Sequence, residues 1–169
     1  PLFVNNYNSP ERFDVIYEFG KTKLLGIEGE LSVQVSNSLK WTGKVNMENY
    51  KSDFEREAWF KPQLRLSSNL LFNFNDKLSF DAAVALQDDV KAKIYTAEPS
   101  SPYVVPDPNT ETSVNVKGFV DLGLGANYKI NKQFSVFLKA NNLLNNKNGR
   151  FLYYQAIGVN GFGGLTYSF

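Results

Sequence analysis

The chain has 169 residues, of which 15% are aromatic and 21% charged, with a formal net charge of +1. That balance gives no reason to expect a nucleic-acid partner. A chain with no Cys and no His lacks disulfides, thiolate metal ligands and the commonest general base. We therefore expect neither an enzyme nor a bound cofactor or metal.

The first 13 residues contain Pro10 and the polar run Asn5–Ser9, which favour an irregular loop over a strand. From Val15 to Val35 the odd positions are mostly apolar, while the even positions from residue 26 to 36 are polar or small. This period-two alternation without a change of phase predicts one strand over residues 14–35. The polar residues 36–38 predict a tight turn after it.

The same alternation recurs six more times. It predicts strands over residues 39–50, 59–75, 77–95, 113–130, 132–144 and 157–169. The connections near 36–38, 75–77 and 130–132 are short, whereas those at 50–58, 96–112 and 145–156 are long. Short periplasmic turns and longer extracellular loops are typical of outer-membrane barrels. Because the first predicted strand runs toward the periplasmic turn at 36–38, we expect residues 1–13 to form an extracellular loop.

A soluble all-β protein, such as a lipocalin-like barrel or a sandwich, is the alternative, because alternation does not say which face points inward. Aromatic residues favour the membrane, since they gather on the apolar face beside the short turns, where an interfacial girdle is expected. These residues are Trp41, Phe72, Phe74, Phe80, Tyr128 and Phe134. The pattern predicts an all-β fold, an antiparallel transmembrane β-barrel in the bacterial outer membrane.

The number of predicted strands is odd. The last strand ends at the short-turn side, so the first must run in the same direction, whereas bacterial single-chain barrels have an even number of strands. The simplest inference is that these seven strands form the C-terminal part of a larger barrel. A small self-contained barrel, with a cramped eighth strand within residues 1–13, is the less favoured alternative.

Ionisable residues fall mostly on the polar faces. Carboxylates such as Asp81 and Asp121 can perform acid–base chemistry, but a charged, hydrated lumen wall explains them better. Asp88 and Asp89 are weak evidence for a divalent-ion site. Aromatic residues in the long loops either stack on a ligand, such as a sugar or a siderophore, or pack loop against loop. These residues are Tyr103, Phe151, Tyr153 and Tyr154.

The C-terminus carries the most specific motif. Gly164, Tyr167 and Phe169 match the C-terminal assembly signal of bacterial outer-membrane barrels, although Phe162 replaces the polar residue that commonly opens it. Residues 119–128, 134–140 and the Asn-Leu motif at 141–145 resemble the end of TonB-dependent outer-membrane receptors. The stretch Gly26–Glu30 resembles that family's recurring Gly-hydrophobic-Glu strand.

The resemblance implies a 22-stranded barrel that takes up a nutrient of the siderophore, vitamin or glycan class. It also implies the partners: outer-membrane lipid, the remaining strands and the plug of the same receptor, an inner-membrane energy-coupling protein, and the barrel-assembly machinery. The alternative function is a non-transporting structural or binding barrel subunit of an outer-membrane complex.

Overall fold

A computed structural model describes residues 2–17, 20–53, 55–95 and 111–169. Seven strands form an antiparallel main sheet in the order β11-β10-β9-β6-β5-β4-β3. They are β3 (Thr22–Gln34), β4 (Leu39–Ser52), β5 (Leu64–Asn73), β6 (Leu78–Gln87), β9 (Phe119–Lys129), β10 (Phe134–Asn141) and β11 (Asn160–Tyr167). Two small sheets pair β1 (Leu2–Asn5) with β2 (Phe13–Ile16), and β7 (Val90–Tyr95) with β8 (Glu111–Val116). No helix in the described ranges is long and apolar enough to cross a membrane.

Three short turns join strands of the main sheet, and two of them share one design. The side-chain oxygen of Asn75 accepts hydrogen bonds from the backbone N–H groups of residues 77 and 78, and Asn131 does the same for residues 133 and 134. In the third turn the hydroxyl of Ser36 accepts from the N–H of Ser38. Asn and Ser favour such turns because their side chains replace a backbone acceptor.

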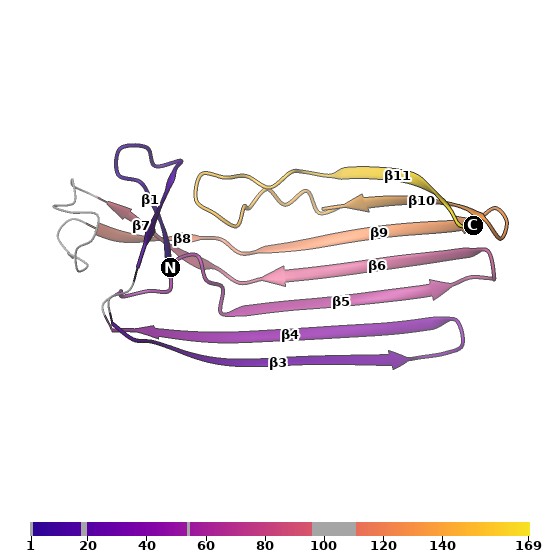
Figure 1. The fold of residues 1–169 in the computed structure, drawn as a ribbon, viewed down its shortest axis with the longest axis horizontal. Helices are drawn as coiled ribbons and strands as arrows, with labels where there is room; N and C mark the ends of the chain where they lie inside the picture. The colour runs from indigo at the N-terminus through magenta and orange to yellow at the C-terminus, as the bar shows by residue number, and fades with distance from the viewer. Residues whose placement is uncertain (1, 18–19, 54, 96–110) are drawn as a thin grey trace.

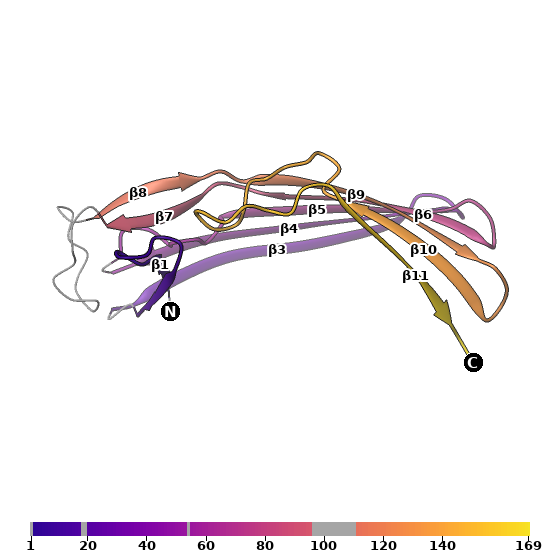
Figure 2. The same cartoon turned by 90° about the horizontal axis from the view of Figure 1, so that it is seen from above.

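The main sheet is a trough (Figures 1 and 2). Its edge strands β3 and β11 bend toward the side on which β1 lies, and that side is the concave face. Figure 1 shows the sheet from this concave face. The three short turns and the C-terminus lie together at one end, and β1, β7 and β8 lie at the other. No further strand pairs with the outer edges of β3 and β11 among the described residues, so the sheet is open.

The N-terminal segment differs from the expected loop. Residues 1–13 contain β1, which pairs with β2 in an antiparallel hairpin. The polar residues form its turn, where Asn6 accepts from the N–H groups of Asn8 and Ser9, and the side-chain amide of Asn5 donates to the carbonyl of Pro10. The single strand expected over 14–35 is also wrong, because β2 and β3 belong to different sheets. Between them, the backbone N–H of Lys21 donates to the carboxylate of Asp53, and the carbonyl of Lys21 accepts from the N–H of Asp53.

The strands expected over 77–95 and 113–130 are each interrupted once, at the same level. Asp88 and Asp89 separate β6 from β7, and residues 117–118 separate β8 from β9. The carboxylate of Asp88 accepts from the N–H of Gln63, and that of Asp89 accepts from the N–H of Gly118. The pairing register is nevertheless the same before and after the break. The hairpin therefore leaves the main sheet without slipping.

Three other expected strands are shorter in the structure, and one is longer. The strand expected over 59–75 begins at Leu64, because Phe60 has a left-handed φ of 56° and its N–H donates to the carbonyl of Lys91. The strand expected over 132–144 ends before Asn142, which has a φ of 51°. The last strand occupies 160–167 rather than 157–169, and β4 extends to Ser52 rather than residue 50.

The buried apolar core of the described residues lies outside the main sheet. It consists of Val4, Trp59, Phe60, Val90, Ala92 and Val116. We call the segments that build it the cap: residues 2–16, 55–62, 90–95, 111–116 and 146–157. Adjacent strand residues point to opposite faces, yet Ala92 and Lys93 are 0% and 2% exposed. Both faces of β7 are therefore covered at this point.

Candidate functional site

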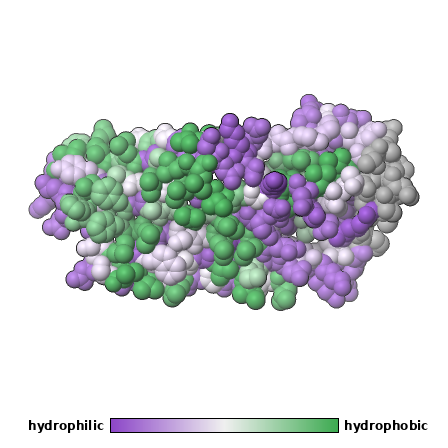
Figure 3. Space-filling model, turned by 180° about the vertical axis from the view of Figure 1, so that it is seen from behind, coloured by the Kyte–Doolittle hydropathy of each residue, from purple (hydrophilic) through white to green (hydrophobic). Residues whose placement is uncertain are grey.

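The two faces of the main sheet have opposite polarity. The pairing registers place one apolar side-chain set on the convex face, where Leu25, Leu138 and Leu165 remain 69–73% exposed. Figure 3 shows this face, with hydrophobic residues gathered from the short-turn end past the middle and hydrophilic residues toward the cap. The residues expected to face lipid lie on it: Leu31, Val33, Val45, Leu66, Leu70, Val84, Leu122, Leu124, Val136 and Leu138.

The concave face carries a network of charged and amide side chains. Glu30 pairs with Lys44 at 2.7 Å across β3 and β4. Arg65 of β5 donates to Glu48 at 3.0 Å and to Asn46 at 3.2 Å. Both ion pairs are partly exposed to solvent, so each contributes little to stability. The network suits a hydrated wall.

Asp81 and Asp121 are placed apart on the concave face and have structural roles. The carboxylate of Asp81 lies over Gly125, where an added Cβ atom would displace it. Asp121 accepts from the backbone N–H of Asn142 at 2.9 Å. No group of three or more acidic side chains suited to a metal ion occurs within the described ranges.

The predicted girdle residues gather on the convex face near the short turns. Phe72 lies opposite Phe80, and Phe134 lies opposite Tyr167 with ring centroids 4.7 Å apart. Tyr128 is paired with Leu78, which follows the turn at Asn75. Phe74 contacts Phe72 edge-on. Trp41 folds over Gly43, and its indole N–H donates to the hydroxyl of Ser68 at 2.8 Å. Its polar atom is thereby satisfied within an apolar surface.

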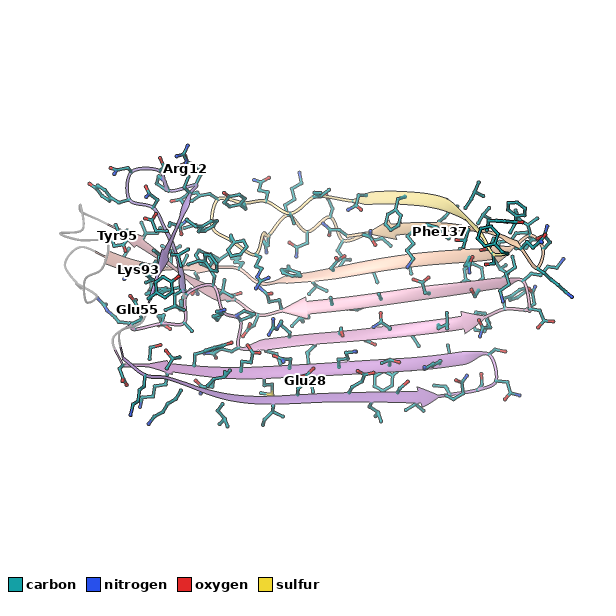
Figure 4. The ribbon with its side chains drawn as sticks, viewed as in Figure 1. Arg12, Glu28, Glu55, Lys93, Tyr95 and Phe137 are labelled. Atoms are coloured by element: carbon teal, nitrogen blue, oxygen red, sulfur yellow. The ribbon has the colours of Figure 1, made fainter. Side chains whose placement is uncertain are left out.

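The predicted assembly signal lies at the free edge of the sheet. Tyr167 contacts Phe169 edge-on at 5.2 Å, and Phe169 is fully exposed. Gly164 leaves space for the ring of Phe137, which occupies a polar-face position and meets Phe162 at 6.2 Å (Figure 4). Sequence analysis missed this aromatic pair. The signal that could have found it is an aromatic residue at a position where the alternation predicts a polar side chain.

Two of the predicted loop aromatics pack loop against loop. Phe151 lies 5.2 Å from Phe60, and Tyr154 stacks on Phe13 at 5.5 Å while its hydroxyl donates to the carbonyl of Glu11. Tyr153 is 58% exposed, with a φ of 67°. Tyr103 lies outside the described residues. The loop aromatics thus connect segments of the cap that are far apart in sequence.

A buried polar cluster ties the cap together (Figure 4). Lys93 lies 3.3 Å from both carboxylate oxygens of Glu55, and the indole of Trp59 donates to Glu55 at 2.6 Å. The ammonium group also lies 5.5 Å from the ring of Tyr95. A buried charge persists only when it is paired. The period-two pattern gave no signal for this cluster, because its members come from a loop and a separate hairpin.

The Asn-Leu motif has a structural role at the end of β10. The side chain of Asn142, 6% exposed, donates to the carbonyls of Asn146 and Ile157 and accepts from the N–H of Asn146. Its left-handed φ of 51° turns the chain, a conformation that Asn tolerates better than most residues. This one side chain therefore holds both ends of the loop over 146–157.

No family model and no curated protein matches the chain. Solved structures do match. A variant of the ferric enterobactin receptor of Pseudomonas aeruginosa has a TM-score of 0.64 at 21% identity, over 85% of this chain and 22% of that chain. The siderophore receptor PirA of Acinetobacter baumannii has a TM-score of 0.67 at 18% identity, over 86% and 22%.

The ferripyoverdine receptor of the Pseudomonas aeruginosa outer membrane, bound to ferripyoverdine, has a TM-score of 0.69 at 16% identity, over 86% of this chain and 19% of that chain. The chain has the fold of an outer-membrane receptor barrel segment. It spans about a fifth of the length of the receptors it matches. Among the described residues the main sheet has seven antiparallel strands and is open, as expected for part of a larger barrel.

Proposed function

We propose that the chain is the C-terminal part of the barrel of a TonB-dependent outer-membrane receptor, which takes up a nutrient with energy from the inner membrane. The observation that carries this proposal is the opposite polarity of the two faces of a curved, open sheet. An apolar convex face fits lipid, and a polar concave face fits a water-filled or plugged lumen. The likeness to siderophore receptors supports the same assignment.

The proposal gives each surface a partner. The edges of β3 and β11 join the remaining strands of the barrel, because unpaired backbone groups are not tolerated in the hydrocarbon region. The plug of the same receptor lies against the concave face, and the inner-membrane energy-coupling protein acts through that plug. The girdle from Trp41 to Phe134 lies at the periplasmic interface, and Gly164, Tyr167 and Phe169 address the barrel-assembly machinery.

The neighbours in structure are receptors, and we assign no enzymatic reaction to the chain. The nutrient of the intact protein has to be found by uptake. Ferric enterobactin, cobalamin and maltotriose, each radiolabelled, represent the siderophore, vitamin and glycan classes. We expect uptake of one probe to be lost both in cells that lack the receptor gene and in cells that lack the inner-membrane energiser.

Two outcomes contradict this function. Uptake that requires the receptor but continues without the energiser indicates a binding or structural subunit instead. Separation of the intact protein from the outer-membrane fraction on a sucrose gradient excludes a membrane barrel of any kind.

A further inference from the structure

A pocket of about 340 Å³ lies where the cap meets the concave face of the main sheet. Side chains from three adjacent strands supply its floor. Asn141 of β10 lies opposite Asn160 of β11 and donates to its side-chain oxygen at 3.2 Å. Asp121 of β9 lies beside them, held by the N–H of Asn142. The volume is at the low end of the range for small-molecule sites, about 300–1,000 Å³.

The other wall is the loop over 146–157, which supplies Arg150, Tyr154 and Gln155. This loop is braced at several points. Asn142 bonds to both of its ends, and the N–H of Ala156 donates to the carbonyl of Lys147 at 3.2 Å. Gly149 lies against the carbonyl of Tyr154 with no room for a Cβ atom. The pocket is thus formed before any ligand arrives, which lowers the entropic cost of binding.

The polar groups around the pocket are mixed in character and balanced in charge. Asp121 and Arg150 supply one charge of each sign. One carboxylate oxygen of Asp121 accepts from the N–H of Asn142 at 2.9 Å, and the side chain of Gln155 is exposed. The guanidinium carbon of Arg150 lies 5.5 Å from the ring centroid of Phe151. Carboxylate, amide and guanidinium groups together offer both acceptors and donors at short range.

We propose that this pocket binds one sugar ring of a neutral glycan. The inference rests on the proposed function and names its substrate class. A sugar hydroxyl both donates and accepts hydrogen bonds. It can donate to the carboxylate, accept from the guanidinium group, and do either with the side-chain amides. The apolar surfaces of Phe119 and Ile157, which also line the pocket, suit the C–H faces of such a ring. A ferric catecholate complex is a multiply charged anion that requires an excess of cationic groups. This pocket has no such excess, because Asp121 balances the charge of Arg150.

The test uses the intact receptor in lipid nanodiscs and saturation-transfer NMR. The neutral probes are the methyl glycosides of glucose, galactose and mannose, and the anionic probe is gallium catecholate. Arg150→Ala and Gln155→Ala each remove pocket donors from an exposed loop position. Lys147→Ala is the matched control, because it removes a cation from the same loop outside the pocket. We expect at least one glycoside to bind, with affinity lowered about threefold to tenfold by each pocket variant and unchanged in the control.

The inference is overturned if gallium catecholate alone binds and Arg150→Ala abolishes that binding. Glycoside binding that neither pocket variant affects overturns it too, because the sugar then binds elsewhere. A receptor that shows energised uptake but binds no glycoside removes this inference and leaves the proposed function standing. A glycoside bound at this pocket in a receptor without energised uptake supports the inference and removes the proposed function.

Discussion

Gly118 lies directly against the backbone carbonyl of Gln87, so close that no Cβ atom fits between them. The contact exists because both strands of the longest hairpin leave the main sheet at one level, at residues 88–89 and 117–118. The carboxylate of Asp89 links the two strands at this level, because it accepts from the N–H of Gly118 at 2.8 Å. This junction determines how the cap is attached to the barrel wall.

Replacing Gly118 with Ala should lower the free energy of unfolding by about 1–3 kcal/mol, because the added methyl group must displace backbone atoms. The measurement is the urea midpoint of the receptor refolded in detergent. Gly26→Ala is the control, since a Cβ there has its nearest neighbour at 3.6 Å. Equal stability of the two variants would show that the junction is not tightly packed.

The inside–outside assignment is tested by adjacent residues of β9. Leu122→Arg places a charge on the convex face and should cost about 2–4 kcal/mol if the residue lies near the bilayer midplane. Asp121→Asn keeps an acceptor for the N–H of Asn142 and should cost far less. Stability in lipid vesicles measures both, and a reversed order of the two costs would invert the assignment.

The two tryptophans give an independent test, because Trp41 lies on the convex face and Trp59 is buried in the cap, 2% exposed. Phospholipids with brominated acyl chains should quench the fluorescence of Trp41 and leave that of Trp59 unchanged. The variants Trp59→Phe and Trp41→Phe isolate each signal in turn. Quenching of Trp59 alone would mean that the cap, and not the sheet, contacts the acyl chains.

Lys93→Met should open the cap while the barrel wall stays folded. Removing one member of a buried ion pair costs about 3–5 kcal/mol, and here Glu55 loses the ammonium group that lies 3.3 Å from both of its carboxylate oxygens. Hydrogen exchange measures the effect, with faster exchange expected in β7 and β8 than in β4. Lys117→Met, at an exposed position, is the control. The double change with Glu55→Gln should restore part of the protection; no restoration would show that the charge pair is not the cause.

Deleting Phe169 should sharply lower the amount of receptor in the outer membrane, while the refolded protein stays stable in detergent. Phe169 is fully exposed, and even complete burial of such a side chain is worth only about 1.5–3 kcal/mol. Quantitative immunoblots of membrane fractions report assembly, with Ser168→Ala as the control. Normal levels after the deletion would mean that the assembly machinery does not read this residue.

Alternation along the chain predicted the main sheet well. Each of its seven strands lies in a predicted range, apart from the two residues by which β4 is longer. Asn75 and Asn131 marked their turns, because an Asn side chain bonds to the backbone two and three residues ahead. The C-terminal motif also indicated the receptor fold. These features are local, so the residues that encode them are neighbours in sequence.

Only the tertiary structure decided where each strand ends and what the loops build. The register from Gln87 to Val90 is continuous, so the phase of the alternation contains no trace of the change of sheet. The buried core forms through contacts between distant segments. Phe60 contacts Phe151, Lys93 pairs with Glu55, and Trp59 belongs to the same cluster as Val4 of β1. Period-two alternation reports which way a side chain points, whereas the sheet that a strand joins depends on pairing partners far away in the chain.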